Sequence, residues 1–146
     1  MKPDTLPHIS KFYHSVDLQI RFNDIDILGH LNNTVYLSFY DTGKAYFFEH
    51  IMDGNINWQK VESVIANIDC AYVAPTYFGE EIEVWTRCME IHEKSFRLQQ
   101  MIVEKKTKQL KSCAETVMVC FDPVSKTSQK ISDTWRAALE KSMKFY

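Results

Sequence analysis

The stretch that decides the fold runs from residue 21 to residue 49 and reads RFNDIDILGHLNNTVYLSFYDTGKAYFFE. Just before and into it, residues 18–22 alternate apolar and polar side chains, which is typical of a half-buried strand. Residues 23–33 form a polar turn with two aspartates, a glycine, a histidine and two asparagines. From residue 34 to about residue 52, large apolar side chains recur at helical spacing. The stretch therefore predicts a strand, a polar turn and a long helix that is covered on several sides.

The turn has the residue types that an anion site needs. A helix that begins at residues 32–34 has unpaired backbone N–H groups in its first turn, and Asn32 or Asn33 is a suitable N-cap. These N–H groups and the helix dipole favour negative charge, such as a developing oxyanion. Asp26 supplies a carboxylate a few residues upstream. Taken alone, Asp24, Asp26 and the two asparagines also fit an ordinary turn and helix cap.

The whole stretch resembles the signature of the hotdog-fold acyl-CoA thioesterases of the 4-hydroxybenzoyl-CoA thioesterase family. That signature is a strand ending in an aromatic residue, then D-x-D-x-x-G-H-x-N-N-x-x-Y, then a long helix. Two later segments also resemble family motifs, namely Asp69-x-x-Tyr72-x-x-Pro75 and the run Phe78–Val84, so the resemblance covers almost the whole chain. The residues that match the signature are Phe22, Asp24, Asp26, Gly29, His30, Asn32, Asn33 and Tyr36.

The resemblance implies thioester hydrolysis. The substrate carbonyl would bond the backbone N–H of Asn33, and Asp26 would act as a nucleophile or as a general base for water. His30 and Asn32 would hold the turn in shape, and Asn32 and Tyr36 would also contact substrate. The resemblance implies no metal or other cofactor, because coenzyme A arrives as part of the substrate.

Basic residues near the strand ends are candidates for binding the coenzyme A phosphates. Lys94 and Arg97 are the two that we predict to do so, and Lys105 and Lys106 are further candidates. Solvated strand-end charges are an equally good interpretation of all four. The resemblance also implies a homodimer or homotetramer, which the aromatic content of 13% favours.

Composition excludes several classes of function. The formal net charge of −2 and the lack of a Lys/Arg block argue against nucleic-acid binding. No apolar run reaches the length of a membrane span, and the N-terminus has no secretory pattern. The four cysteines show no C-x-x-C pair, so we expect free thiols. Together these features predict a cytoplasmic protein with one domain over residues 1–146, of which residues 1–12 are an N-terminal tail.

The remaining pattern predicts an α+β fold. Runs of strand type at short spacing imply an antiparallel sheet of five or more strands, and the helix at 34–52 is the large element available to cover it. Gly43 in mid-helix indicates that a strand passes close by, since glycine otherwise costs a helix up to about 1 kcal/mol. This is the order of the hotdog fold, with a C-terminal helix added. The expected strands are 14–22, a strand within 58–74, 81–92, 95–105 and 111–121, and the terminal helix is 132–144.

Other functions remain open at this level. The enzyme could act on acyl carrier protein, which a basic surface would favour, or the chain could be a noncatalytic acyl-CoA-binding protein. A hotdog dehydratase lacks support, because no histidine-on-strand and helix-acid arrangement is evident. Asp41 and Glu49 on the helix are alternative carboxylates, although solvent-facing or dimer-facing roles fit them better. No G-x-S-x-G elbow, phosphate loop or histidine metal spacing occurs.

Overall fold

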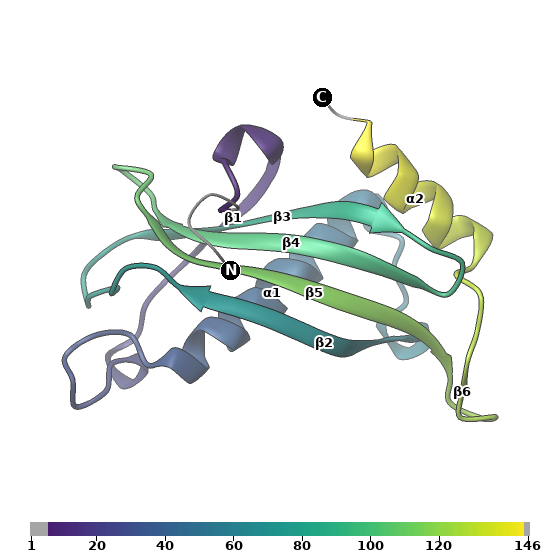
Figure 1. Cartoon of the computed structure of the whole chain (residues 1–146), viewed down its shortest axis with the longest axis horizontal. Coiled ribbons are helices and arrows are strands. Elements are labelled where there is room, and N and C mark those ends of the chain that lie inside the picture. The colour runs from purple at the N-terminus through teal and green to yellow at the C-terminus, as the bar shows by residue number, and fades with distance from the viewer. Residues whose placement is uncertain (1–5, 145–146) are drawn as a thin grey trace.

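The computed structural model describes residues 6–144, and in it a curled antiparallel sheet wraps one long helix (Figure 1). The sheet order is β1-β3-β4-β5-β2, and the short β6 pairs with β5. The strands are β1 (His14–Leu18), β2 (Ser63–Tyr72), β3 (Ile82–Ile91), β4 (Ser95–Glu104), β5 (Leu110–Asp122) and β6 (Thr127–Ser128). The helices are α1 (Asn33–Ile51) and α2 (Asp133–Met143), and 3-10 turns lie at Ile9–Lys11, Phe22–Asp24 and Trp58–Lys60.

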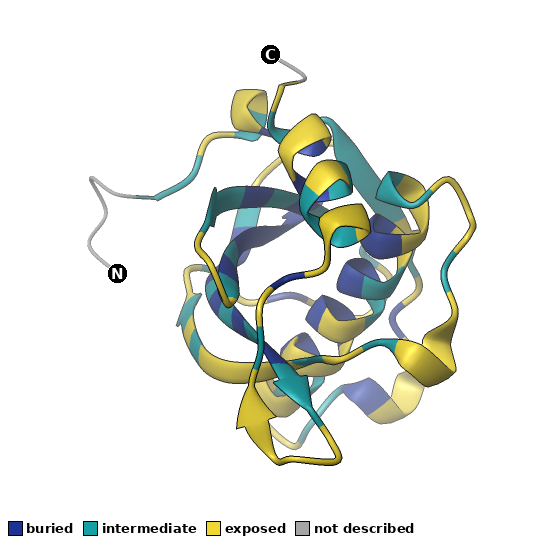
Figure 2. Ribbon diagram, turned by 90° about the vertical axis from the view of Figure 1, so that its right-hand side faces the viewer, coloured by how far each residue is buried: buried dark blue, intermediate teal, exposed yellow. Residues whose placement is uncertain are grey.

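Helix α1 lies inside the curl of the sheet, and its buried side meets the inward side chains of the strands (Figure 2). Tyr40 and Phe47 are completely buried against the sheet. A Cβ atom added at Gly43 would lie 2.5 Å from Val84 Cγ1 on β3, so the helix backbone touches the sheet there. The expected close approach at this glycine is confirmed. The α+β hotdog architecture predicted from the sequence, including the C-terminal helix, is confirmed as well.

The first strand is shorter than the sequence predicted. It ends at Leu18 rather than at Phe22, and Phe22–Asp24 forms a 3-10 turn instead. The reason is local: Asp24 Oδ2 accepts the Arg21 backbone N–H at 2.8 Å, and this bond curls the chain before the alternating pattern ends. Phe22 is consequently 80% exposed. The other predicted strands agree to within two residues, apart from the start of β2, which the sequence placed only within 58–74.

The N-terminal segment is more ordered than the predicted tail. Ile9–Lys11 forms a 3-10 turn, and Phe12 is buried in a cluster on the outer face of the sheet with Met101, Val103 and Cys113. The guanidinium carbon of Arg87 lies 5.6 Å from the centroid of the Phe12 ring. The first five residues of the predicted tail lie outside the described residues.

The cysteines and the helices bear on two further expectations. Cys70, Cys88, Cys113 and Cys120 form no disulfide with one another within residues 6–144. Within residues 6–144, no helix is long and apolar enough to cross a membrane.

Candidate active site

The first half of the polar turn is held in one conformation by the pairing of its own side chains. Asp24 is 2% exposed, and its Oδ1 accepts a hydrogen bond from Arg21 Nη2 at 3.0 Å. Burial alone would raise the pKa of Asp24, but the hydrogen bonds and charge of Arg21 outweigh it and lower the pKa. Both carboxylate oxygens are thus engaged with Arg21. Asp24 is held in its charged form and is occupied in shaping the turn.

The second half of the turn is a small loop that presents Asp26. The Asp26 N–H donates to the His30 carbonyl at 3.2 Å, and the Gly29 N–H donates to the Asp26 carbonyl at 3.0 Å. Gly29 has a φ of +86°, which favours glycine at this position. Asp26 is half-buried, and its Oδ1 accepts the Leu28 N–H at 2.9 Å. Unlike Asp24, the Asp26 carboxylate pairs with no basic side chain within residues 6–144.

The start of helix α1 leaves one backbone donor free. The Asn32 side chain caps the helix by accepting the Thr34 N–H at 3.1 Å, and the Val35 N–H donates to the Asn32 carbonyl at 2.9 Å. The Asn32 N–H donates to the Asp24 carbonyl at 2.9 Å. Among residues 6–144, no hydrogen-bond acceptor engages the Asn33 N–H. Asn33 therefore carries the available donor at the positive end of the helix dipole.

Two tyrosines form the wall beside this donor. The rings of Tyr36 and Tyr72 meet edge to face with centroids 5.2 Å apart. Tyr36 is buried, and its hydroxyl lies 2.9 Å from Thr76 Oγ1. A pocket opens at this point, and its lining residues are His30, Asn33, Tyr36, Tyr72, Val73, Ala74 and Pro75.

The structure brings most of the predicted site residues together. His30, Asn33 and Tyr36 line one pocket, with Asn32 as the adjoining cap. Asp26 lies on the neighbouring loop, and the pocket wall formed by the described residues does not include it. The Nδ1 atom of His30 lies 3.5 Å from the Leu31 carbonyl oxygen.

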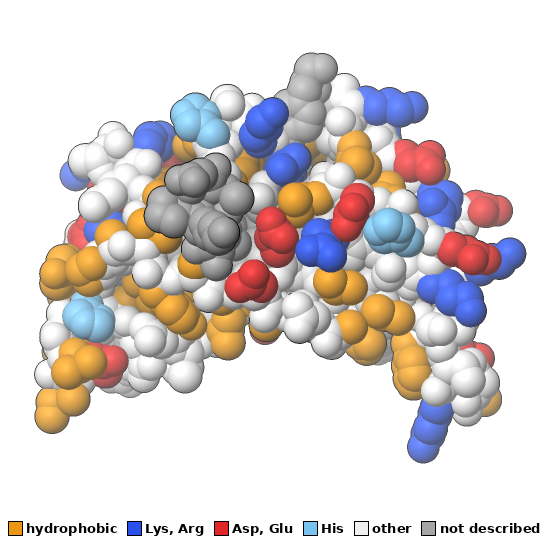
Figure 3. Space-filling view, viewed as in Figure 1, with side chains coloured by type: hydrophobic (Ala, Val, Ile, Leu, Met, Phe, Trp, Pro, Cys, Tyr) orange, Lys and Arg blue, Asp and Glu red, His pale blue; other side chains and the backbone are white. Residues whose placement is uncertain are grey.

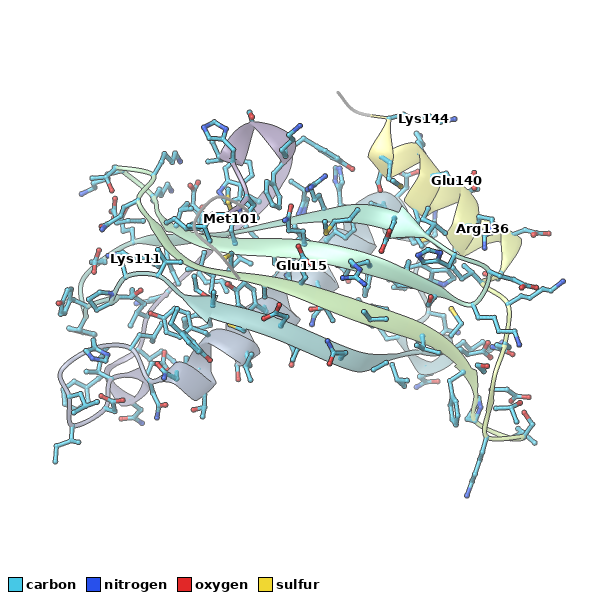
Figure 4. All side chains as sticks on the ribbon, in the orientation of Figure 1. Met101, Lys111, Glu115, Arg136, Glu140 and Lys144 are labelled. Atoms are coloured by element: carbon cyan, nitrogen blue, oxygen red, sulfur yellow. The ribbon has the colours of Figure 1, made fainter. Side chains whose placement is uncertain are left out.

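Lys94 and Arg97 lie away from this pocket. In Figure 4, Lys111 marks the end of the sheet near the helix start, and Arg136 marks the opposite end. Lys94 follows Glu93, whose carbonyl accepts a hydrogen bond from Arg136 at 3.3 Å. Arg97 pairs with Glu90 at 2.8 Å and with Glu115 at 3.4 Å. Within one chain, neither residue adjoins the turn.

Lys105 lies nearer the turn than Lys94 and Arg97 do. Its Nζ pairs with Asp17 Oδ2 at 2.5 Å, and it lines a groove with Ile20 and with the segment 78–82. Asp41 pairs with Lys44 at 3.2 Å, and Glu49 accepts a hydrogen bond from Trp58. No cluster of potential metal ligands occurs among the described residues.

Sequence reasoning missed three residues that build the site. Lys111 is 4% exposed at its side chain; it donates to the Pro75 carbonyl at 2.9 Å and pairs with Glu80 at 3.0 Å, which fixes the segment after β2. Tyr72 completes the pocket wall, and the buried Thr76 supports it through the Tyr36 hydroxyl. The motif Asp69-x-x-Tyr72-x-x-Pro75 pointed to this region, but the role of its tyrosine depends on a contact across 39 residues.

Known proteins resemble this chain in sequence and in fold. The family model described as the Thioesterase-like superfamily matches residues 20–139. No curated protein matches the sequence.

Several solved structures share the fold. A thioesterase from Thermus thermophilus, complexed with coenzyme A and Zn, superposes with a TM-score of 0.81 at 22% identity, covering 91% of this chain and 96% of that one. The PA5185 protein from Pseudomonas aeruginosa gives a TM-score of 0.78 at 25% identity, covering 91% and 93%. A 1,4-dihydroxy-2-naphthoyl-CoA thioesterase from Synechocystis gives 0.78 at 15% identity, covering 86% and 93%.

The family model spans most of the chain, from just before the polar turn into helix α2. The matched range includes Asp24, Asp26, Asn33, Tyr36 and Tyr72. The chain belongs to the Thioesterase-like superfamily, which confirms the enzyme class predicted from the sequence, a thioester hydrolase.

Proposed function

We propose that this protein hydrolyses acyl-CoA thioesters and is an enzyme of the 4-hydroxybenzoyl-CoA thioesterase type. The observation that carries the proposal is the unengaged Asn33 N–H at the start of α1, in a pocket wall beside the loop that bears Asp26. A donor held in place by the helix stabilises an oxyanion at no reorganisation cost. The coenzyme A complex of the similar Thermus thermophilus thioesterase supports coenzyme A as the carrier.

In the proposed reaction, the thioester carbonyl oxygen accepts the Asn33 N–H. Asp26 then attacks the carbonyl carbon, which forms a mixed anhydride and releases the coenzyme A thiolate, and water hydrolyses the anhydride. Alternatively, Asp26 takes a proton from the water that attacks the carbonyl. Asp24 serves neither route, because Arg21 occupies its oxygens. Asn32 and His30 hold the turn, and Tyr36 forms part of the substrate wall.

The exposed edge of β2 supports the proposal that two copies associate. This ten-residue strand lies at the sheet edge, where unpaired backbone groups readily pair with another chain. Val64, Ile65 and Tyr72 on this strand, and Val73 directly after it, are each 44–49% exposed. Figure 3 shows that the molecule is hollowed along its lower edge, with hydrophobic side chains along the hollow. A homodimer through this edge is the simplest assembly, and a homotetramer would pair two such dimers.

Three further expectations stand as parts of the proposal. Lys105 is better placed than Lys94 or Arg97 to bind a coenzyme A phosphate of a substrate in the same chain. It lies at the end of the sheet that is next to the polar turn. The enzyme needs no cofactor beyond the coenzyme A of its substrate. We place its activity in the cytoplasm, as expected from the sequence.

The test is thiol release from a panel of acyl-CoAs by the wild-type protein, followed by Asp26→Asn on the best substrate. Asp26→Asn keeps the size of the side chain and removes its charge, so kcat should fall at least about 100-fold, with the folded protein retained. Asp24→Asn is the matched control, and any loss of activity there should follow its loss of stability. A near wild-type rate for Asp26→Asn would refute the assignment. Faster release from acyl carrier protein than from acyl-CoA would favour the carrier-protein alternative.

A further inference from the structure

The hydroxyl of Tyr72 connects the edge strand to the helix start. It donates a hydrogen bond to the Asn33 carbonyl oxygen at 3.1 Å. Tyr72 is the last residue of β2, and Asn33 is the first residue of α1. The bond therefore reaches from the sheet to the same residue whose N–H is the available donor.

The ring of Tyr72 is held in place by a second set of contacts. It packs edge to face on Tyr36, with an interplanar angle of 75°. The Tyr36 hydroxyl is fixed by Thr76, and the Thr76 carbonyl accepts the Leu31 N–H at 2.7 Å. These contacts form a closed loop that runs from the strand end to the turn and back to the helix. The hydroxyl of Tyr72 thus meets Asn33 from a fixed direction.

We propose that Tyr72 is a positioning residue, which keeps the Asn33 N–H aimed into the pocket by holding the Asn33 carbonyl. This inference rests on the proposed function. The first turn of a helix is its least constrained part, since its N–H groups have no partners within the helix. An oxyanion donor must be in place before charge develops on the substrate. The Asn32 carbonyl, which shares a peptide group with the Asn33 N–H, accepts the Val35 N–H at 2.9 Å, and the Tyr72 hydroxyl holds the next peptide group through the Asn33 carbonyl. The backbone is thus held on both sides of the Asn33 α-carbon.

Tyr72→Phe tests the inference, because it removes the hydroxyl and keeps the ring that packs on Tyr36. Tyr72 is 45% exposed, so the variant should remain folded. We expect kcat to fall about three- to tenfold, the effect of losing one neutral hydrogen bond, while KM changes less than about twofold. Tyr46→Phe is the matched control, since Tyr46 is 50% exposed on the same helix and does not line the pocket. It should leave both constants unchanged.

A pair of unreactive substrate analogues separates positioning from a general structural effect. In the first, a methylene group replaces the sulfur, so the ligand keeps the carbonyl that accepts the Asn33 N–H. In the second, a methylene group replaces the carbonyl. Calorimetry should show that Tyr72→Phe weakens binding of the ketone about three- to tenfold and leaves binding of the thioether unchanged.

The outcomes distinguish this inference from the proposed function. If wild-type protein prefers the ketone to the thioether and Tyr72→Phe leaves both affinities and kcat unchanged, Tyr72 has no positioning role. If both affinities fall equally, the tyrosine acts only on the shape of the pocket and the inference is wrong. If wild-type protein binds neither analogue and hydrolyses no acyl-CoA, the proposed function itself fails.

Discussion

Replacing Gly43 by alanine is the sharpest test of the packing between α1 and the sheet. In an unconstrained helix this change would stabilise the protein by up to about 1 kcal/mol, because alanine has the higher helix propensity. Here the new methyl group would lie 2.5 Å from Val84 Cγ1 and 3.2 Å from Gln100 Nε2. Carbon atoms in contact normally lie about 3.5–4.0 Å apart, so helix and strand would have to separate by about 1 Å.

The neighbours of Gly43 offer little relief. Val84 is completely buried and β-branched, so its side chain has few alternative rotamers. Gln100 is held by hydrogen bonds of 3.0 Å to the Tyr40 carbonyl and to Thr86. Overpacking of this kind costs about 1–3 kcal/mol. We take the upper half of the overpacking cost, about 2–3 kcal/mol, and subtract the gain in helix propensity of about 1 kcal/mol. Gly43→Ala should therefore destabilise the protein by about 1–2 kcal/mol.

The measurement is urea denaturation together with thermal melting, where this loss corresponds to a fall in Tm of about 5 °C for a chain of this size. The double variant Gly43→Ala with Val84→Ala supplies the control. Removing the methyl groups that clash should make the alanine at position 43 neutral or favourable in that background, which a double-mutant cycle would show as coupling. A single variant Gly43→Ala that is more stable than wild type would refute the close packing.

Three further predictions concern stability and assembly. Burial and, second, the charge of His50 lower the pKa of His14 from 6.5 to about 4. Between these pH values the unfolded chain binds more protons than the folded one, so the free energy of unfolding should fall as pH drops from 6.5 to about 4. His14→Phe should make this dependence of stability on pH less steep. Lys111→Met should cost about 1–3 kcal/mol in urea denaturation by leaving the Glu80 carboxylate unpaired, whereas a loss within error would contradict its bracing role. Light scattering should give a dimer or tetramer mass at micromolar concentration, and Ile65→Lys on the edge of β2 should lower it; a monomeric wild type would end the assembly proposal.

Most of the fold could be predicted from the sequence because its signals are local. Helical spacing of large apolar side chains located α1, which ends at Ile51, one residue before the predicted end. Gly43 even indicated a contact distant in sequence, because a glycine in mid-helix requires a packing reason. The strand at 14–22 was predicted too long, since the alternating pattern continues past Leu18 while the Arg21–Asp24 bond curls the chain.

The site was harder to predict, because its construction depends on contacts between distant residues. Lys111 binds Pro75 and Glu80 over more than 30 residues, and no local pattern marks a lysine in a strand as buried. Lys94 and Arg97 were expected near the substrate because they lie at strand ends. A hairpin sheet has two ends, however, and the antiparallel order puts these residues at the end away from the helix start.

The two aspartates of the motif show how one short turn separates bracing from chemistry. Asp24 is the last residue of the 3-10 turn that Arg21 caps, and its buried carboxylate is neutralised by the neighbouring guanidinium. Asp26 lies two residues later on a loop closed by Gly29, and its carboxylate accepts a hydrogen bond from a backbone donor, the Leu28 N–H. A carboxylate paired with arginine is a poor nucleophile and a poor base, because the charge that it would use is already compensated. The pattern D-x-D alone cannot show which of the two aspartates is available for chemistry. The arginine three positions before the first aspartate does show it, because it pairs with that aspartate. The chemistry of the turn is therefore expected at Asp26, next to the helix donor that the braced aspartate helps to hold through the Asn32 N–H.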